Sequence, residues 1–169
     1  GPKVDFFVPD ALGREWQLGT IQLDFSLPER FDLEYVNEEG QRSRPVMIHR
    51  AMLGSLERFM GVIIEHFAGA MPPWLSPSQV IIIPIADRHA EKAQELKSKL
   101  IKEKIRVDID SRNERMNSKI REAQMNKIPY MVILGDKEIE SGVVSIRLRT
   151  GENLQSIPIE DFISSVKKN

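Results

Sequence analysis

The sequence predicts an α/β chain with a strand-rich first part and a second part in which strands and helices alternate. The two parts meet at Met71–Pro77, where three prolines fall within seven residues. Proline removes a backbone donor and fixes φ, so this segment cannot continue a helix and is typical of a linker. Strands and one helix precede it, and a βαβαβ order follows it, which favours a sheet flanked by helices. We therefore predict domains at residues 1–76 and 77–169.

The first part contains strand patterns at Lys3–Val8, Trp16–Phe25 and Val46–Ile48. Alternation along the middle strand divides its side chains between two faces. These faces are Leu18, Thr20 and Gln22 on one side and Gly19, Ile21, Leu23 and Phe25 on the other. The short apolar run at Val46–Ile48 predicts a buried strand, and Gly40 predicts a turn before it.

The strongest helix signal follows Gly54. Apolar residues recur there with the spacing of one helical face, and Gly69 ends the pattern. The positions are Leu56, Phe59, Met60, Ile63, Ile64 and Phe67.

In the second part, apolar runs predict strands at Val80–Ile85, Ile105–Ile109 and Tyr130–Leu134. Two helices are expected between them, the first capped by Asp87 and the second opened by a capping box at Ser111–Glu114. The first helix has an apolar stripe of Ala90, Ala93, Leu96, Leu100 and Ile101, and the second has Met116, Ile120 and Ala123 on one face.

The end of the chain adds a fourth strand and a last helix to the second part. Val143–Arg149 alternates as a strand that turns at Thr150–Gly151, which makes the predicted sheet mixed. A helix from about Pro158 to Lys168 is expected to pack Phe162, Ile163 and Val166.

Composition excludes several classes of protein. The chain has no cysteine, so it has neither a disulfide framework nor a thiolate metal site. No apolar run is long enough to span a bilayer and no signal-peptide pattern opens the sequence, so we expect no membrane partner. Residues 78–169 carry 17 Lys and Arg against 14 Asp and Glu, a mild excess that suits a polyanion. Because the chain starts at Gly1 within a strand pattern, we interpret it as a piece of a longer protein.

Two residues of the first part could carry chemistry. Arg58 falls in the first turn of the helix after Gly54, where free backbone amides favour anions, and its planar cation can stack on a base or bind a phosphate. An ordinary exposed arginine paired with Glu57 is the alternative. His49 ends a short strand, where a hydrogen-bonded structural histidine is the alternative to a ligand. We assign no role to His66 or His89, which are expected to be surface or half-buried residues.

In the second part, the alternation of Val143–Arg149 places Arg147 and Arg149 on one face, expected to be exposed. Two arginines at this spacing form a donor array suited to bases and phosphates. A predicted turn at Gly135–Glu138 and a helix start at Asn113 add carboxylate and amide groups that can read base edges in single-stranded RNA. A charged solvated strand face is the alternative.

In order along the chain, these residues resemble those of threonyl-tRNA synthetases, a family of class II aminoacyl-tRNA synthetases. The likeness to the threonine-pocket strands lies in Gly1–Asp5, Ala11–Gln17 and Gly19–Phe25. The likeness to motif 3 lies in Pro45–Ala51 and Gly54–Arg58. The likeness to the anticodon domain lies in Arg112–Glu114, Lys119–Glu122, Pro129–Met131, Gly135–Glu138 and Arg147–Arg149. The resemblance covers essentially the whole chain.

The resemblance implies part of a class II antiparallel-sheet catalytic domain in residues 1–76 and a mixed-sheet anticodon-binding domain in residues 77–169. It implies a role for Arg58 as the catalytic residue that stacks on the adenine of ATP and binds its phosphates.

The resemblance also assigns roles in threonine and RNA binding. His49 is implied to be one of three protein ligands of a zinc ion that chelates threonine, which lets the site reject valine. Thr20 and Gln22 line the threonine site, with Ser55 contributing. The implied anticodon readers are Asn113, Glu138 and Arg147, with Arg149 nearby as a base or phosphate contact.

The implied activity is that of a threonine–tRNA ligase, with ATP and Mg, threonine and threonine tRNA as partners, in a cytoplasmic homodimer. Motifs 1 and 2, an editing region and the other two zinc ligands would lie upstream of Gly1, and Leu18 stands where many members have Cys. One histidine cannot hold zinc tetrahedrally, so we expect this chain alone not to form threonyl adenylate.

Two other classes of protein stay open. One is a non-catalytic tRNA- or RNA-binding module or accessory subunit. The other is a regulatory α/β domain, which would need acidic or glycine-rich phosphate loops after its strands.

Overall fold

The computed structural model describes residues 1–168; Asn169, the last residue of the predicted second domain, lies outside the described residues. Contacts divide the chain into two units, residues 1–69 and 70–169, so the proline-rich segment belongs with the second unit. No helix among the described residues is long and apolar enough to cross a membrane.

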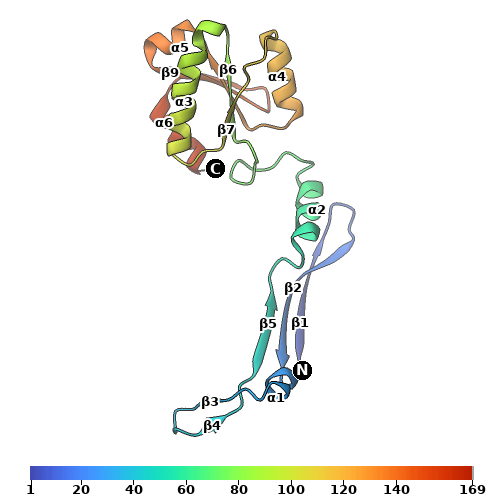
Figure 1. Cartoon of the computed structure of the whole chain (residues 1–169). Helices are drawn as coiled ribbons and strands as arrows, with labels where there is room; N and C mark the ends of the chain where they lie inside the picture. Colours follow the sequence, from blue (N-terminus) through green and yellow to red (C-terminus); the bar gives the residue numbers. More distant parts are fainter. Residues whose placement is uncertain (169) are drawn as a thin grey trace. The chain divides into compact units, whose positions relative to one another are not determined.

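The first unit is built on a three-stranded antiparallel sheet in the order β1-β2-β5 (Figure 1). Its strands are β1 (Lys3–Pro9), β2 (Glu15–Asp24) and β5 (Met47–Ala51), close to the three predicted positions. The expectation that Val46–Ile48 is buried is wrong, because β5 is an edge strand and Ile48 is 62% exposed.

Between β2 and β5 the chain forms a short helix, α1 (Ser26–Arg30), and a small hairpin of β3 (Tyr35–Val36) and β4 (Arg42–Ser43). The turn expected at Gly40 is confirmed, since its φ of 76° is in the left-handed region that glycine tolerates. The two-residue strands around the turn are not evident in the sequence.

The predicted helix after Gly54 is α2 (Leu56–His66), and it begins where Ser55 caps it by accepting the Arg58 N–H at 3.1 Å. None of its residues is buried within the chain, and Leu56, Met60 and Ile64 are exposed. The helix predicted from the amphipathic pattern is therefore confirmed, but its apolar stripe is not buried within this chain.

The second unit is a mixed sheet, as predicted, but it has five strands instead of the four expected, in the order β10-β9-β8-β6-β7. β6 is parallel to both β7 and β8, whereas β9 is antiparallel to β8 and β10. The bounds are Val80–Pro84 for β6, Val107–Ile109 for β7, Tyr130–Leu134 for β8, Val143–Leu148 for β9 and Asn153–Pro158 for β10. The sequence missed β10, whose residues are mostly exposed and partly polar.

Strand β10 ends the sheet and is irregular. Its register with β9 shifts between Leu154 and Ile157, and Ser156 between them has a φ of 56°. This is the geometry of a β-bulge, which bends the strand and interrupts the regular ladder.

Helices cover both faces of the second sheet (Figure 1). α3 (Ala90–Lys102) and α6 (Ile159–Lys168) pack into the main core, whereas α4 (Met116–Met125) packs on the opposite face. The main core contains Val80, Ile82, Leu96, Leu100, Val132, Val144, Phe162, Ile163 and Val166, and the α4 side contains Ile83, Ala123 and Met131. The expected burial of the last helix is confirmed, but Ile101 and Ala90 of the α3 stripe are exposed.

The predicted helix starts need correction. A short 3-10 helix, η1 (Asp87–His89), precedes α3, and neither helix has a side-chain cap from Asp87. α4 begins after Arg115 without a side-chain cap, so the capping box at Ser111–Glu114 is wrong and Asn113 lies in the loop before the helix. The segment expected as a turn at Gly135–Glu138 instead opens a helix, α5 (Asp136–Ser141).

Candidate functional site

The first unit gathers the predicted substrate residues on one face of its sheet. Gln22 on β2 pairs directly with His49 on β5, and Thr20 pairs with Ala51. Directly opposed residues of an antiparallel pair project from the same face, so Thr20, Gln22 and His49 lie side by side although 27 positions separate Gln22 from His49 in the sequence.

His49 makes a carboxylate contact on this face. Its Nε2 lies 2.9 Å from Asp24 Oδ2, and this neighbour lowers the pKa of Asp24. If Nε2 donates to the carboxylate, Nδ1 is left to bind a metal, which is the usual arrangement of a metal-binding histidine. Residues 1–168 contain no group of three His, Asp or Glu placed to hold a metal ion. The residues present therefore fit a zinc site only as one ligand with its orienting carboxylate.

Asp5 on β1 adds a second carboxylate next to Thr20. Its pKa is lowered by the Thr20 hydroxyl, by Lys3, whose ammonium lies 3.0 Å away, and by the Gln17 amide, which donates to it at 2.6 Å. The Thr20 hydroxyl makes no hydrogen bond of normal geometry within the described residues. Its oxygen is buried, and the hydroxyl lies close enough to Asp5 to lower the pKa of that carboxyl.

Arg58 is exposed in the first turn of α2, and its side chain is held from the β2 side. Its Nη1 donates to the carbonyl of Gln17 at 3.0 Å, and its guanidinium carbon lies 5.9 Å from the centre of the Trp16 ring. The pairing with Glu57 weighed above is not observed among the described ion pairs. Gly54 lets the turn before α2 pass close to β2. It has a φ of 65°, and a Cβ there would lie 3.3 Å from the Gln17 oxygen. Ser55 serves α2 as its cap.

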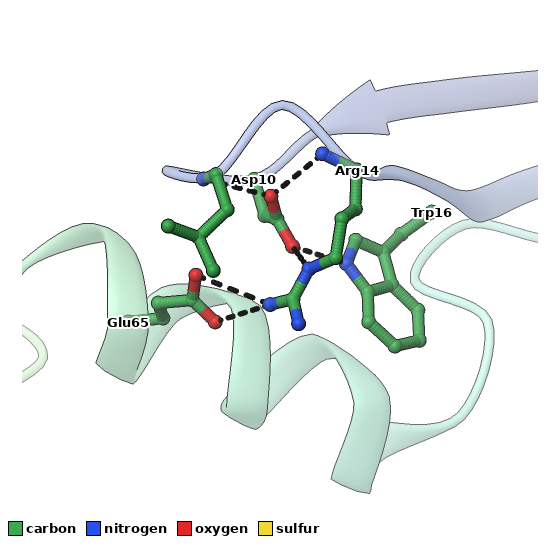
Figure 2. Close-up of polar contacts among 5 residues, drawn as sticks. Asp10, Arg14, Trp16 and Glu65 are labelled. Atoms are coloured by element: carbon green, nitrogen blue, oxygen red, sulfur yellow. Dashed lines mark hydrogen bonds and ion pairs between the residues drawn. The ribbon is translucent and has the colours of Figure 1, made fainter.

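A polar cluster ties the β1–β2 turn to α2 (Figure 2). The Asp10 carboxylate accepts from Trp16 Nε1 at 2.8 Å and from Arg14 Nε at 2.5 Å, and Arg14 also binds Glu65 at 3.0 Å. Burial raises the pKa of Asp10, but the hydrogen bonds from Trp16 and Arg14 lower it by more, so it stays well below its ordinary value. Because Trp16 stands beside Arg58, the cluster fixes the wall against which Arg58 lies.

The second unit brings Glu138 and Arg147 to one face of its sheet. Ser145 on β9 donates to Glu138 Oε1 at 2.7 Å, and Arg147 follows Ser145 on the same side of the strand. Arg147 pairs with Met131 of β8, which packs with Ala123 of α4, so this is the α4 side of the sheet.

Arg147 has donors to spare. Its Nη1 donates to Asn153 at 3.1 Å, but its buried Nε has no hydrogen-bond partner within residues 1–168. Buried donors are rarely left unpaired. Arg147 is half-buried instead of fully exposed, which corrects the expectation of a solvated arginine face.

Arg149 does not share this environment. Its Nη1 donates to the carbonyl of Met71 at 2.6 Å and lies 3.5 Å from that of Lys127. The half-buried guanidinium therefore holds the proline-rich segment against the end of β9. A role in RNA binding has to be compatible with this structural one.

Asn113 lines a cavity of about 360 Å³ at the carboxyl ends of β6 and β7. The loop after β6 forms one wall and the loop after β7 forms the other. Asn113 belongs to the loop that leads into α4, the helix on the same face as Glu138 and Arg147. The cavity that Asn113 lines also borders α3, which packs on the other face of the sheet, so Asn113 is not brought together with Glu138 and Arg147 in the described structure.

Nothing in the sequence indicated an ionic network around Asp136, in which His89 is buried while Arg88 and Asp136 are exposed. His89 is 2% exposed, which overturns the expectation of a surface or half-buried residue; its Nδ1 accepts the Ala86 N–H at 3.2 Å and its Nε2 lies 2.8 Å from Asp136 Oδ1. Arg88 binds the same carboxylate at 2.5 and 3.0 Å, and Arg88 and then His89 lower the pKa of Asp136. The network joins the loop after β6 to the first turn of α5, which carries Glu138.

Two known families match the chain. The family described as "Anticodon binding domain" matches residues 79–169, and the family described as "tRNA synthetase class II core domain (G, H, P, S and T)" matches residues 1–67. The fold and the site thus define a portion of a class II aminoacyl-tRNA synthetase with an anticodon-binding domain.

Individual relatives indicate which class II synthetases the chain resembles. A threonine–tRNA ligase of Sulfurihydrogenibium sp. (strain YO3AOP1) is 55% identical over 99% of this chain and 26% of its own length. One from Deinococcus radiodurans is 59% identical over 90% of this chain and 23% of its own length. The crystal structure of the RNA binding domain of threonyl-tRNA synthetase from Cryptosporidium parvum Iowa II matches with a TM-score of 0.91 and 40% identity, covering 99% of this chain and 43% of that one.

The chain belongs to the threonyl-tRNA synthetase family, which confirms the resemblance seen in the sequence. It spans about a quarter of the length of the curated relatives it matches.

Proposed function

We propose that this chain provides the anticodon reader and part of the aminoacylation site of a threonine–tRNA ligase, which uses ATP to attach threonine to threonine tRNA. The observation that carries the proposal is the placement of Glu138 and Arg147 on one sheet face of a domain that belongs to an anticodon-binding family. One group only accepts hydrogen bonds and the other only donates them.

The chemistry of the two groups suits the edges of unstacked bases. Burial raises the pKa of Glu138, but hydrogen bonds from Ser145 and from the Gly135 N–H lower it by more, so the carboxylate is ionised at neutral pH. An ionised carboxylate accepts base N–H groups, and the spare donors of Arg147 bind base oxygens and nitrogens or a phosphate. Bases in single-stranded RNA loops are read in this way.

In the first unit, Arg58 is positioned to bind ATP, which enters with Mg as a substrate. It lies at the start of α2, where unpaired amides add to its charge, and Trp16 and the Gln17 carbonyl restrict its guanidinium. Such positioned charge stabilises the α-phosphate when the threonine carboxylate attacks it and pyrophosphate leaves. Thr20 and Gln22 line the adjacent face for threonine, and Ser55 maintains the turn that presents Arg58.

His49 would be one ligand of a zinc ion, with Asp24 orienting its ring. When bound, the metal would supply chelation of the amino and hydroxyl groups of threonine. Further ligands would come from residues outside this chain, as would the partner surface of a homodimer. We propose the cytoplasm as the compartment of this activity.

Binding to a stem-loop RNA tests the proposal. The full chain is mixed with fluorescently labelled stem-loops that carry either the threonine anticodon or an unrelated anticodon on the same stem, and anisotropy gives the affinities. We expect tighter binding to the threonine anticodon. Equal affinity for both RNAs would refute anticodon recognition by this chain.

A further inference from the structure

The second unit has another hollow at the opposite end of its sheet from the cavity that Asn113 lines. This hollow, here named the Trp74 hollow, has a volume of about 490 Å³, within the usual size range of ligand sites. It lies at the amino ends of β6 and β7, where the C-terminal ends of α3 and α6 also lie (Figure 1). The 13 residues of α3 run between the two ends of the sheet, a length of about 20 Å at 1.5 Å per residue.

An exposed tryptophan on a well-fixed turn forms one wall of the Trp74 hollow. Trp74 is 64% exposed. The Arg106 guanidinium donates to the carbonyl of Trp74 at 2.7 Å and to that of Ser76 at 2.8 Å. The amides of Leu75 and Ser76 both donate to the Pro72 carbonyl at 3.0 Å. Because the backbone of this turn is held from two sides, the indole stays at the surface, where its face is available for stacking.

Positive charge surrounds this indole. Four cationic side chains line the hollow against one carboxylate, namely Lys102, Lys104, Arg106 and Lys167 against Glu103. Lys167 binds Glu103 at 2.5 Å and lowers the pKa of that carboxyl, so these two charges offset each other. Within residues 1–168, Lys102 and Lys104 make no ion pair, and Arg106 donates only to backbone carbonyls and to no carboxylate. The lining therefore presents an excess of positive charge that an anion can neutralise.

Helix ends explain part of this charge, but they do not explain Lys104. Lys102 and Lys167 lie in the last turns of α3 and α6, where cations offset the partial negative charge of the free carbonyls. Lys104 lies beyond α3 and has a φ of 62°, a conformation that glycine adopts at lower cost. The charge of Lys104 is thus neither part of an ion pair nor part of the helix end.

We infer that the Trp74 hollow binds a segment of single-stranded RNA without regard to its sequence. Trp74 stacks on one base, and Lys102 and Lys104 bind the phosphates on either side of that base. Surfaces that combine cations with aromatic side chains bind single strands in this way, because every base has a π face and every nucleotide has a phosphate. The inference goes beyond the proposed function, since the hollow lies away from the loops and the sheet face assigned to anticodon reading.

Two oligomers without an anticodon test the inference. The full chain is titrated with a fluorescently labelled oligouridylate of about eight nucleotides, the length of a typical single-strand site. It is also titrated with an abasic oligomer of the same length, which keeps the phosphates and lacks the bases. Anisotropy at several salt concentrations gives the affinities of the unaltered chain and of the variants Trp74→Ala, Trp74→Phe and Lys104→Gly.

Lys127→Gly is the matched control for Lys104→Gly. Lys104 and Lys127 both follow a helix at a positive φ, 62° and 58°. In both places the next amide closes the helix, from Ile105 to the Leu100 carbonyl at 3.0 Å and from Ile128 to the Ala123 carbonyl at 3.1 Å. Glycine tolerates this backbone, so neither substitution should lower the melting temperature. Lys127 follows α4, on the opposite face of the sheet from α3, and does not line the hollow.

Stacking and charge should separate in the results. Trp74→Ala is expected to weaken oligouridylate binding by roughly tenfold and to leave binding of the abasic oligomer unchanged, whereas Trp74→Phe keeps a ring and should lose less. Lys104→Gly should weaken the binding of both oligomers. It should also reduce the slope of log affinity against log salt by about 0.7, because one phosphate contact is lost. Lys127→Gly should change neither affinity nor slope.

Several results would overturn the inference. These are no binding of oligouridylate by the unaltered chain, equal affinity for the abasic oligomer, which describes contact with any polyanion, and an equal loss in Lys127→Gly. Weaker oligouridylate binding in Arg147→Ala would also overturn it, since the strand would then lie on the face proposed for anticodon reading. If Trp74→Ala does not fold, Lys104→Gly and the abasic oligomer decide. The comparison of anticodon stem-loops concerns another surface, so the proposed function and this inference can fail separately.

Discussion

The two units of this chain differ in how much of their apolar surface they bury. The core of the second unit contains many fully buried side chains, including Ile82, Leu100 and Phe162. In the described first unit, Leu18 is the one large hydrophobic residue in the buried class apart from Pro28, and Phe6, Phe7, Leu56, Met60 and Ile64 are exposed. Both units have regular hydrogen-bonded strands, so the comparison shows that a correct backbone pattern does not by itself supply a core.

Separating the two units tests this difference most directly. We expect residues 70–169 to unfold in one cooperative thermal transition and residues 1–69 to show none, because a small sheet needs a covered hydrophobic face for independent stability. Circular dichroism melts of the two segments measure this. A cooperative melt of the first segment would show that its ion pairs and hydrogen bonds are sufficient without a core.

Matched truncations of buried and exposed side chains measure the difference between the units within the full chain. Ile82→Ala should lower the free energy of unfolding by about 2–5 kcal/mol, because Ile82 is fully buried on β6. Ile64→Ala makes the same chemical change on α2, where the residue is 49% exposed, and should cost less than about 1 kcal/mol. Urea denaturation measures both. Equal losses would mean that α2 is covered in solution.

RNA binding should also divide between the units. Arg147→Ala is expected to weaken binding of the threonine anticodon stem-loop by roughly tenfold, because it removes a charged donor array from the reading face. Arg58→Ala removes the same side chain from the first unit and should leave that affinity unchanged. If Arg58→Ala weakens binding as much, the RNA is not read by the second unit alone.

The smallest expected effect is a dependence of stability on pH. The pKa of Asp136 is lowered by Arg88 and His89, so its contribution is present above the ordinary aspartate pKa of about 4 and is lost as pH falls through the lower folded value. Asp136→Asn should therefore lower the melting temperature at neutral pH and reduce its decline in acid. Glu140→Gln is the control, since Glu140 is exposed on the same helix. An unchanged acid slope in Asp136→Asn would exclude the contribution.

The sequence predicted the core strands and the last helix of the second unit well, because their apolar residues are also their buried residues. β8 was placed at its observed bounds, and Phe162, Ile163 and Val166 are buried as expected. β10 was missed because its exposure leaves little hydrophobic pattern to detect.

Local polar signals were less reliable, because other groups took the roles assigned to them. Asp87 was expected to cap the first helix, but His89 accepts the Ala86 N–H there, and the loop before α4 is organised by Asp110 instead of by Ser111. The motif residues of the site were identifiable one by one. The contact of His89 with Asp136 crosses 47 positions, and the burial of Lys119 goes against its residue type, so neither is visible without the fold.

The irregular edge strand β10 has a consequence for the behaviour of the molecule in concentrated solution. A regular outer strand offers a row of free backbone groups on which a second molecule can extend the sheet. In β10 the shift between Leu154 and Ile157 breaks that row, and Pro158 provides no amide at its end. The second unit can therefore keep a half-exposed strand at its border without recruiting further copies of itself into a continuous sheet.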